Sequence, residues 1–291
     1  GFPNKGLYVI SGSDTLHTYT ETDANMASVL AQTLSMRAYA YSHLIQLYAP
    51  VPSTVRSLQL YDSEENGAII PLYTEDNMDL PQAPTNMKAI YSRIESDLKT
   101  AIDYFDGFSE QISRTSKLSI DINVSRGLLA YALLNEASNI YRPDRQAPVY
   151  KEAIKYATDV INTGIYRVLP NNELTTNGFN NVGTNCWMWG QDVTTETATG
   201  LGSFFGQVDI HTYSYAAAGD TKAIDSKLYD EIAATGWDGR VNWFRSGSDD
   251  FPYCPDGKFF NPKTKHTTKL DDVDRDWLCD NVFMRIEVAY L

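Results

Sequence analysis

The sequence has few cysteines, and their number is odd. Its 291 residues include Cys186, Cys254 and Cys279, too few for a disulfide framework. Two states of these residues fit the sequence: one disulfide with a free thiol, or three inert thiols. No Cys/His spacing typical of zinc binding is present, so we expect no metal site and no cofactor.

The sequence also lacks runs of basic residues. It holds 24 Lys and Arg against 37 Asp and Glu, which gives a net charge of −13. Proteins that bind nucleic acids or anionic lipid surfaces neutralise phosphate groups with basic side chains. We therefore expect no nucleic-acid partner and no anionic lipid surface as a partner. Neutral ligands such as sugars and peptides are compatible with this charge.

Long hydrophobic segments are missing as well. No apolar run approaches the roughly 20 residues that span a bilayer. No signal peptide is visible, and the chain begins at Gly1 without a methionine. It stops at "FMRIEVAYL", residues 283–291, which we predict to be the opening of a helix. We therefore expect both ends to be cuts within a longer protein.

Sequence patterns of common enzymes are absent. There is no GxSxG, HExxH, Walker-type loop or GxGxxG. No carboxylate pair is marked out for glycoside hydrolysis, and "DDVDRD" (271–276) lacks the calcium-loop pattern, so we interpret it as an acidic surface turn. We expect a protein without catalytic residues. A hydrolase with a dispersed acid pair is the alternative.

Amphipathic helical segments fill the first half of the chain. Apolar residues recur at steps of three and four, which predicts helices with one buried face. Tyr41 and Tyr48 fall on the buried face of the first helix, Thr85 is the expected N-cap of the second, and Gly164 ends the fourth. The four predicted helices are residues 20–49, 85–105, 123–141 and 148–164. A short loop and facing alanines between the last two are typical of tetratricopeptide-like hairpins.

From residue 165 the composition changes to short aromatic segments separated by Gly, Asn and Thr. One helix, "TKAIDSKLYDEIAA" (221–234), interrupts them. We predict short strands in "IYRVLP" (165–170), "CWMWGQDV" (186–193) and "FFGQVDIHTYSY" (204–215). The sequence thus predicts a mostly α fold in a single domain, 1–291. A helical scaffold, 21–164, precedes an irregular, loop-rich, ligand-binding lobe with further helices, 165–291.

Aromatic residues are concentrated in this second part. A flat ring can stack on the C–H face of a pyranose while nearby polar side chains pair with its hydroxyl groups. Any one ring is more often a core residue, so the prediction concerns the cluster. The candidate stacking residues are Trp187, Trp189, Trp237, Trp243 and Tyr253. Asp238 and Arg240 are candidate hydroxyl partners or, alternatively, a structural ion pair.

The segment "MRAYAYSHLIQLYAPVP", residues 36–52, resembles the helix R-A-Y-x-Y-x-x-L-x-x-x-[FY]-[GA]-x-[VI]-P of the SusD/RagB-like family of Bacteroidetes. Further segments resemble later family motifs in the same order. They are "AIIPLYTED", "MKAIYSRIESDLKTAIDYF", "SRGLLAYALLNEASNIY", "YKEAIKYATDVINTGIYRVLPN", "LYDEIAATGWDGRVNWF", "KFFNP" and "FMRIEVAYL". The resemblance covers most of the chain. We expect the family's N-terminal segment with its lipid-bearing cysteine, and the family's final helices, to lie outside this chain.

This resemblance implies a cell-surface glycan-binding lipoprotein on the extracellular face of the outer membrane. The family's N-terminal lipid anchor, its only tie to the membrane, would lie outside this chain. The protein would deliver an oligosaccharide ligand to a SusC-like TonB-dependent transporter, with the helical scaffold facing the transporter and the ligand bound in the irregular lobe. A peptide-binding or purely structural partner-interaction module of the same transporter complex is the alternative. No catalytic residue is implied.

Overall fold

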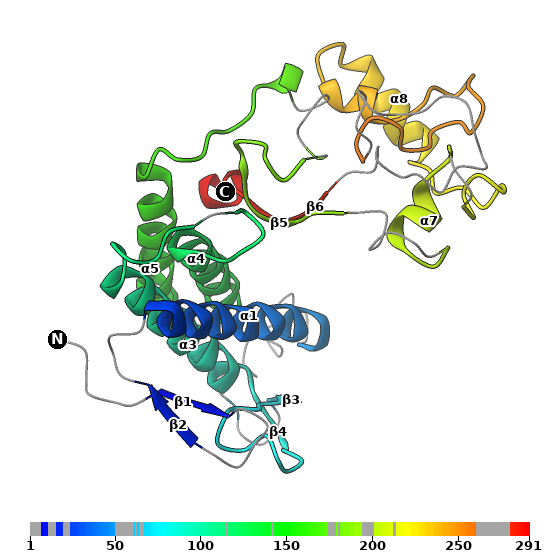
Figure 1. Cartoon of the computed structure of the whole chain (residues 1–291). Coiled ribbons are helices and arrows are strands. Elements are labelled where there is room, and N and C mark those ends of the chain that lie inside the picture. Colours follow the sequence, from blue (N-terminus) through cyan, green and yellow to red (C-terminus); the bar gives the residue numbers. More distant parts are fainter. Residues whose placement is uncertain are drawn as a thin grey trace. The chain divides into compact units, whose positions relative to one another are not determined.

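The computed structural model of the chain consists of two compact units (Figure 1). The first comprises residues 1–164 and 288–291, and the second residues 165–287. The residues that the structure describes are 7–10 and 16–19 (backbone only), 24–49, 61, 63, 67–114, 116–140, 143–173, 179, 181–193, 201–211, 214–259 and 280–291. The units divide after Gly164, where the composition of the sequence also changes.

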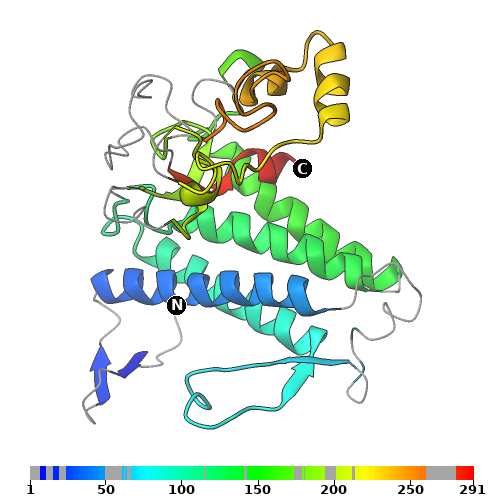
Figure 2. The same cartoon turned by 90° about the vertical axis from the view of Figure 1, so that its right-hand side faces the viewer.

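Long helices form the body of the first unit. They are α1 (Ala24–Tyr48), α3 (Met87–Gly107), α4 (Ile122–Asn139) and α5 (Pro143–Asn162). Helix α3 packs against both α1 and α4, and α4 packs against α5, so the helices lie side by side (Figure 2). Two antiparallel strand pairs complete the unit: β1 (Leu7–Ile10) with β2 (Leu16–Tyr19), and β3 (Ala68–Pro71) with β4 (Pro84–Asn86). The mostly α fold is confirmed.

Short polar side chains start these helices. Asn86 caps α3 by accepting a hydrogen bond from the Ala89 backbone N–H at 2.9 Å, which satisfies a donor that the first turn leaves open. The prediction of Thr85 as the cap is wrong, because Thr85 lies in β4 and pairs with Ile70. At the other end of the unit, Gly164 follows α5 with φ +65°, as expected for a glycine that ends a helix.

Two details of the predicted helices are also wrong. Tyr41 is buried as expected, whereas Tyr48, the last residue of α1, is exposed. Helix α5 begins at Pro143, five residues before the predicted start, and includes Pro148. Pro143 fits the first helical position, where no N–H partner is needed, and so extends the helix.

The second unit is irregular, with short elements between loops. Its strands β5 (Trp187–Gln191) and β6 (Asn281–Arg285) pair antiparallel. Its helices are α7 (Phe204–Val208), α8 (Ser226–Ala234) and the 3₁₀ helix η1 (Gly239–Trp243). The short helix α9 (Glu287–Tyr290) follows β6 across the unit boundary. The loop-rich character predicted for this part is confirmed.

Several strand and helix predictions in this part are wrong. Residues 204–208 form α7, since Ser203 Oγ accepts a hydrogen bond from the Gly206 backbone N–H at 3.1 Å and starts a helical turn. Residues 165–170 form no strand. The predicted C-terminal helix starts later than expected, because residues 283–285 belong to β6 and the helix begins at Glu287. Within the described residues, no helix is long and apolar enough to cross a membrane.

Candidate functional site

A tight turn at the end of α8 exposes Trp237. Gly236 has φ +69°, and its backbone N–H donates to the Ala233 carbonyl at 3.2 Å, the arrangement typical of a glycine just past a helix. The chain therefore leaves the helix axis directly before Trp237. This side chain is 76% exposed, which is unusual for so large an apolar ring.

Asp238 fixes the far side of this turn. Its carboxylate caps η1 by accepting from the Arg240 backbone N–H at 3.0 Å, and its own N–H donates to Thr235 Oγ1 at 3.0 Å. Asp238 also pairs with the Arg240 side chain, whose Nε and Nη2 donate to Oδ2 at 2.9 and 2.5 Å. These hydrogen bonds hold the pKa of Asp238 below its usual value. Of the two roles predicted for this pair, the structure shows the ion pair.

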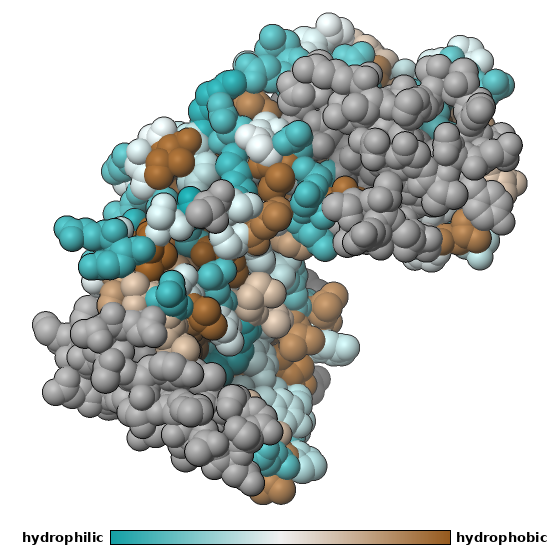
Figure 3. Space-filling view, in the orientation of Figure 1, coloured by the Kyte–Doolittle hydropathy of each residue, from teal (hydrophilic) through white to brown (hydrophobic). Residues whose placement is uncertain are grey.

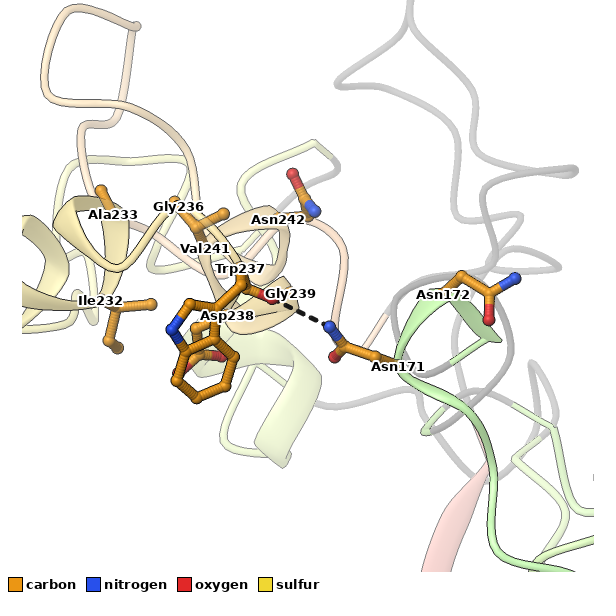
Figure 4. A pocket seen from close by; sticks show the side chains of 10 residues that line it. All are labelled: Asn171, Asn172, Ile232, Ala233, Gly236, Trp237, Asp238, Gly239, Val241 and Asn242. Atoms are coloured by element: carbon orange, nitrogen blue, oxygen red, sulfur yellow. Dashed lines mark hydrogen bonds between the residues drawn. The ribbon is translucent and has the colours of Figure 1, made fainter.

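An open pocket of about 500 Å³ lies beside the turn, within the size range of small-molecule sites. Among the described lining residues, Trp237 is the only one with an aromatic ring and Asp238 the only one with a charged side chain. Figure 4 shows the indole ring projecting from the turn, with the Asn171 amide directed at the Trp237 backbone and the Asn172 and Asn242 side chains pointing away from the ring. The pocket is lined by Asn171, Asn172, Ile232, Ala233, Gly236, Trp237, Asp238, Gly239, Val241 and Asn242.

Asn171 joins the two chain segments that form the pocket. Its Nδ2 donates a hydrogen bond to the Trp237 carbonyl at 3.0 Å (Figure 4). Gly239 makes room for this contact, since a Cβ atom there would lie 2.8 Å from Asn171 Oδ1. The asparagines of the pocket were not among the predicted site residues. For Asn171 and Asn172, the only local signal is the "PNN" turn at 170–172, far from Trp237 in sequence.

Trp187 and Trp189 do not belong to this pocket. Both lie on β5, whose residues are buried on both faces of the strand up to Gly190. Trp189 packs against Phe283 of β6, with ring centroids 4.7 Å apart. The prediction that these two tryptophans stack on a ligand is therefore wrong, because neither ring has an accessible face.

Trp243 and Tyr253 also serve packing. The Trp243 ring is buried edge-on against Phe179 at 5.1 Å, with the Lys258 ammonium 5.0 Å from its centroid. Its predicted role in stacking is wrong for the same reason. Tyr253 is half-buried and packs edge-on against Tyr229 of α8 at 5.2 Å, outside the pocket lining. Among the candidate rings, Trp237 alone is broadly accessible.

The described residues offer little reactive chemistry near this pocket. They contain no group of three His, Cys, Asp or Glu side chains that could hold a metal ion. Cys186 and Cys254 are buried free thiols, and burial raises the pKa of both. Cys279 and the acidic segment 271–276 lie outside the described residues. The pocket combines an apolar platform with hydrogen-bonding amides, an arrangement suited to binding.

The two units together have the fold of the SusD-like proteins. The SusD-like carbohydrate binding protein from Bacteroides vulgatus matches with a TM-score of 0.63 and 20% identity, over 92% of this chain and 50% of that one. A laminarin binding SusD-like protein matches at 0.58 and 17%, over 92% and 59%. A structure with xylogluco-oligosaccharide matches at 0.53 and 18%, over 92% and 54%.

These matches confirm the fold that the sequence motifs imply. The chain spans between 50% and 59% of the length of the three structures. No protein-family model and no curated protein sequence matches the chain.

Proposed function

We propose that this protein is a SusD-like glycan-binding protein that holds oligosaccharides non-covalently in the pocket beside Trp237. The observation that carries this proposal is the exposed Trp237 ring at a pocket whose lining also includes asparagine side chains. The ring offers an apolar face for a pyranose, and amides both donate and accept hydrogen bonds. Specific small-molecule sites commonly combine an apolar surface with a few polar groups in this way.

Binding without catalysis is supported by the acid content of the pocket. Glycoside hydrolysis generally needs two carboxyl groups that flank the scissile bond. Asp238 is the only carboxylate among the lining residues that the structure describes, and it is engaged by Arg240. Those residues therefore offer no acid pair for the hydrolase alternative.

Calorimetric titration with neutral oligosaccharides tests the proposal. We expect Trp237→Ala to weaken binding by about tenfold or more, because an exposed aromatic anchor is the kind of residue that dominates binding energy. Tyr215→Ala is the matched control, since its ring is exposed in the same unit but does not line the pocket. Equal affinity in the Trp237 variant would place the site elsewhere, and release of shorter sugars would show a hydrolase. Binding of peptides but no glycan would favour the peptide-binding alternative.

We further propose that the protein acts at the extracellular face of the outer membrane, held by an N-terminal lipid anchor, and delivers its ligand to a SusC-like TonB-dependent transporter. The support is the sequence resemblance and an apolar row on α1. Val29, Met36 and Leu47 are exposed and are spaced by seven and eleven residues, close to whole helical turns. Hydrophobic atoms are exposed near the C-terminal end of α1 (Figure 3).

Co-purification from membranes tests this second proposal. We expect Met36→Glu with Leu47→Glu to reduce recovery of the transporter, because charge on an apolar contact disfavours its burial. Glycan affinity should not change, since both residues lie in the first unit. Ile154→Glu, an exposed apolar position on α5, is the control. Undiminished recovery with the α1 variant would argue against this surface.

A further inference from the structure

Resting on the proposed function, we propose that the Trp237 pocket takes uncharged oligosaccharides and rejects glycans that carry carboxylate or sulfate groups. Two observations carry this inference: the described lining holds neutral asparagine amides and one exposed ring, and its carboxylate already has a counter-ion.

The polar side chains of the pocket match hydroxyl groups. An asparagine amide provides two N–H donors and one carbonyl acceptor. A sugar hydroxyl both donates and accepts, so each part of the amide finds a complement on an uncharged sugar. A carboxylate or sulfate only accepts, so it leaves an amide oxygen of the lining, such as that of Asn242, facing a second acceptor.

Proteins bind carboxylate and sulfate groups mainly through Arg and Lys. Among the lining residues that the structure describes, there is neither an Arg nor a Lys to neutralise an anionic sugar. Arg240 is adjacent, but its Nε and Nη2 make three hydrogen bonds to the Asp238 carboxylate. Its positive charge is therefore already balanced by Asp238 and offers little net attraction to an anionic sugar.

The overall charge of the chain acts in the same direction. The net charge is −13 over 291 residues, so the surrounding potential disfavours the approach of anions. This long-range repulsion is screened by salt, whereas the local mismatch in the pocket is screened much less. The preference for uncharged ligands should therefore persist at moderate salt.

Titrations with matched glycan pairs test this inference. The probes are galacto-oligosaccharides with oligogalacturonides of equal length, and laminari-oligosaccharides with their sulfated derivatives. We expect at least one uncharged member to bind about tenfold or more tighter than its charged counterpart. Its affinity should change by less than about twofold between low and moderate salt, because no counter-ion is released. Trp237→Ala should abolish that binding.

A gain-of-charge variant makes the test independent of loss of structure. Asn242→Lys introduces a cation at an exposed position of the lining and should strengthen binding of the charged member by about tenfold. Tighter binding of a charged member by the unaltered protein, lost in Trp237→Ala, would overturn the inference while the proposed function stands. No effect of Asn242→Lys would also overturn it. Failure of every glycan to bind would overturn the proposed function itself.

Discussion

Arg37 of α1 donates two hydrogen bonds to Asp97 of α3, from Nε to Oδ2 at 2.6 Å and from Nη2 to Oδ1 at 2.7 Å. Asp97 is only 3% exposed, and Arg93 Nε lies 2.9 Å from its Oδ1. Glu75 bridges the same two arginines. Burial opposes the charge of Arg37, but the hydrogen bonds to the two acids outweigh it and hold its pKa above its usual value. The segment that contains Arg37 and the segment that contains Asp97, each of which resembles a SusD/RagB-like motif, therefore contact each other through this ion pair.

Removing one side of this buried pair should destabilise the protein strongly. We expect Arg37→Ala to lower the free energy of unfolding by about 3 kcal/mol, because it leaves the Asp97 carboxylate buried with incomplete compensation. Lys155→Ala, which removes an exposed pair with Asp159 at 3.5 Å, should cost less than about 0.5 kcal/mol. Urea denaturation measures both values. Similar losses in the two variants would show that the Arg37 contact is no stronger than a surface pair.

Glu136 should make the free energy of unfolding fall as the pH rises. Burial, with a contribution from the Glu95 carboxyl group, raises the pKa of Glu136 to about 8 from its ordinary 4.5. Between these values the unfolded chain releases a proton that the folded chain keeps, so the free energy of unfolding falls as pH rises from 4.5 to 8. The expected loss is on the order of 5 kcal/mol, at about 1.4 kcal/mol for each unit between the two pKa values.

Denaturation of Glu136→Gln at pH 5 and pH 8.5 checks this prediction. The amide keeps an acceptor for the Tyr61 hydroxyl but carries no charge. The loss of unfolding free energy between pH 5 and pH 8.5 should therefore be smaller in this variant. Glu75→Gln is the control. The pKa of Glu75 is lowered to about 2, chiefly through hydrogen bonding that overcomes its burial, so its contribution is lost only as pH falls from 4.5 toward 2. An unchanged pH dependence in Glu136→Gln would refute the assignment.

Asn171 and Gly239 should be energetically coupled. Asn171→Ala removes the hydrogen bond to the Trp237 carbonyl and should weaken glycan binding by about threefold to tenfold. Gly239→Ala should act similarly, since the nearest atoms to its new Cβ all belong to the Asn171 amide. In the double variant the clash is gone, so the two effects should not add, with a coupling of about 1 kcal/mol. Additive losses in the binding cycle would contradict this geometry.

Buried and exposed tryptophans should separate stability from binding. Trp189→Ala should cost about 3–5 kcal/mol of unfolding free energy, because it empties a packed site against Phe283. Trp237→Ala should change stability by less than about 0.5 kcal/mol, since its ring is exposed. Thermal unfolding of both variants measures this contrast. A large loss of stability in Trp237→Ala would mean that the ring is a packing element after all.

Local patterns predict the helices of the first unit well. In α3, buried apolar residues recur at helical steps, namely Ile90, Ile94, Leu98 and Ala101. This single apolar face was enough to predict the helix. Short aromatic segments are harder to predict. Residues 204–208 have β-type composition, yet a single hydrogen bond to Ser203 suffices to begin a helix.

The candidate site was predictable only in part, because exposure is a property of the whole fold. Trp187 and Trp237 look equivalent in sequence, but Trp187 lies on a strand covered on both faces and Trp237 follows the Gly236 turn. The partner of that turn, Asn171, is 66 residues away in the chain. No periodicity connects such positions, so the sequence alone could not assign Asn171 to the same pocket as Trp237.

The most direct test of the central claim is the indole N–H spectrum of the protein during titration with an uncharged oligosaccharide that it binds. Each tryptophan gives its own indole signal, and Trp237→Phe identifies the signal of Trp237. We predict that the Trp237 signal shifts on saturation while the signals of the buried Trp187, Trp189 and Trp243 stay in place. A saturated complex in which the Trp237 signal does not move would contradict the account.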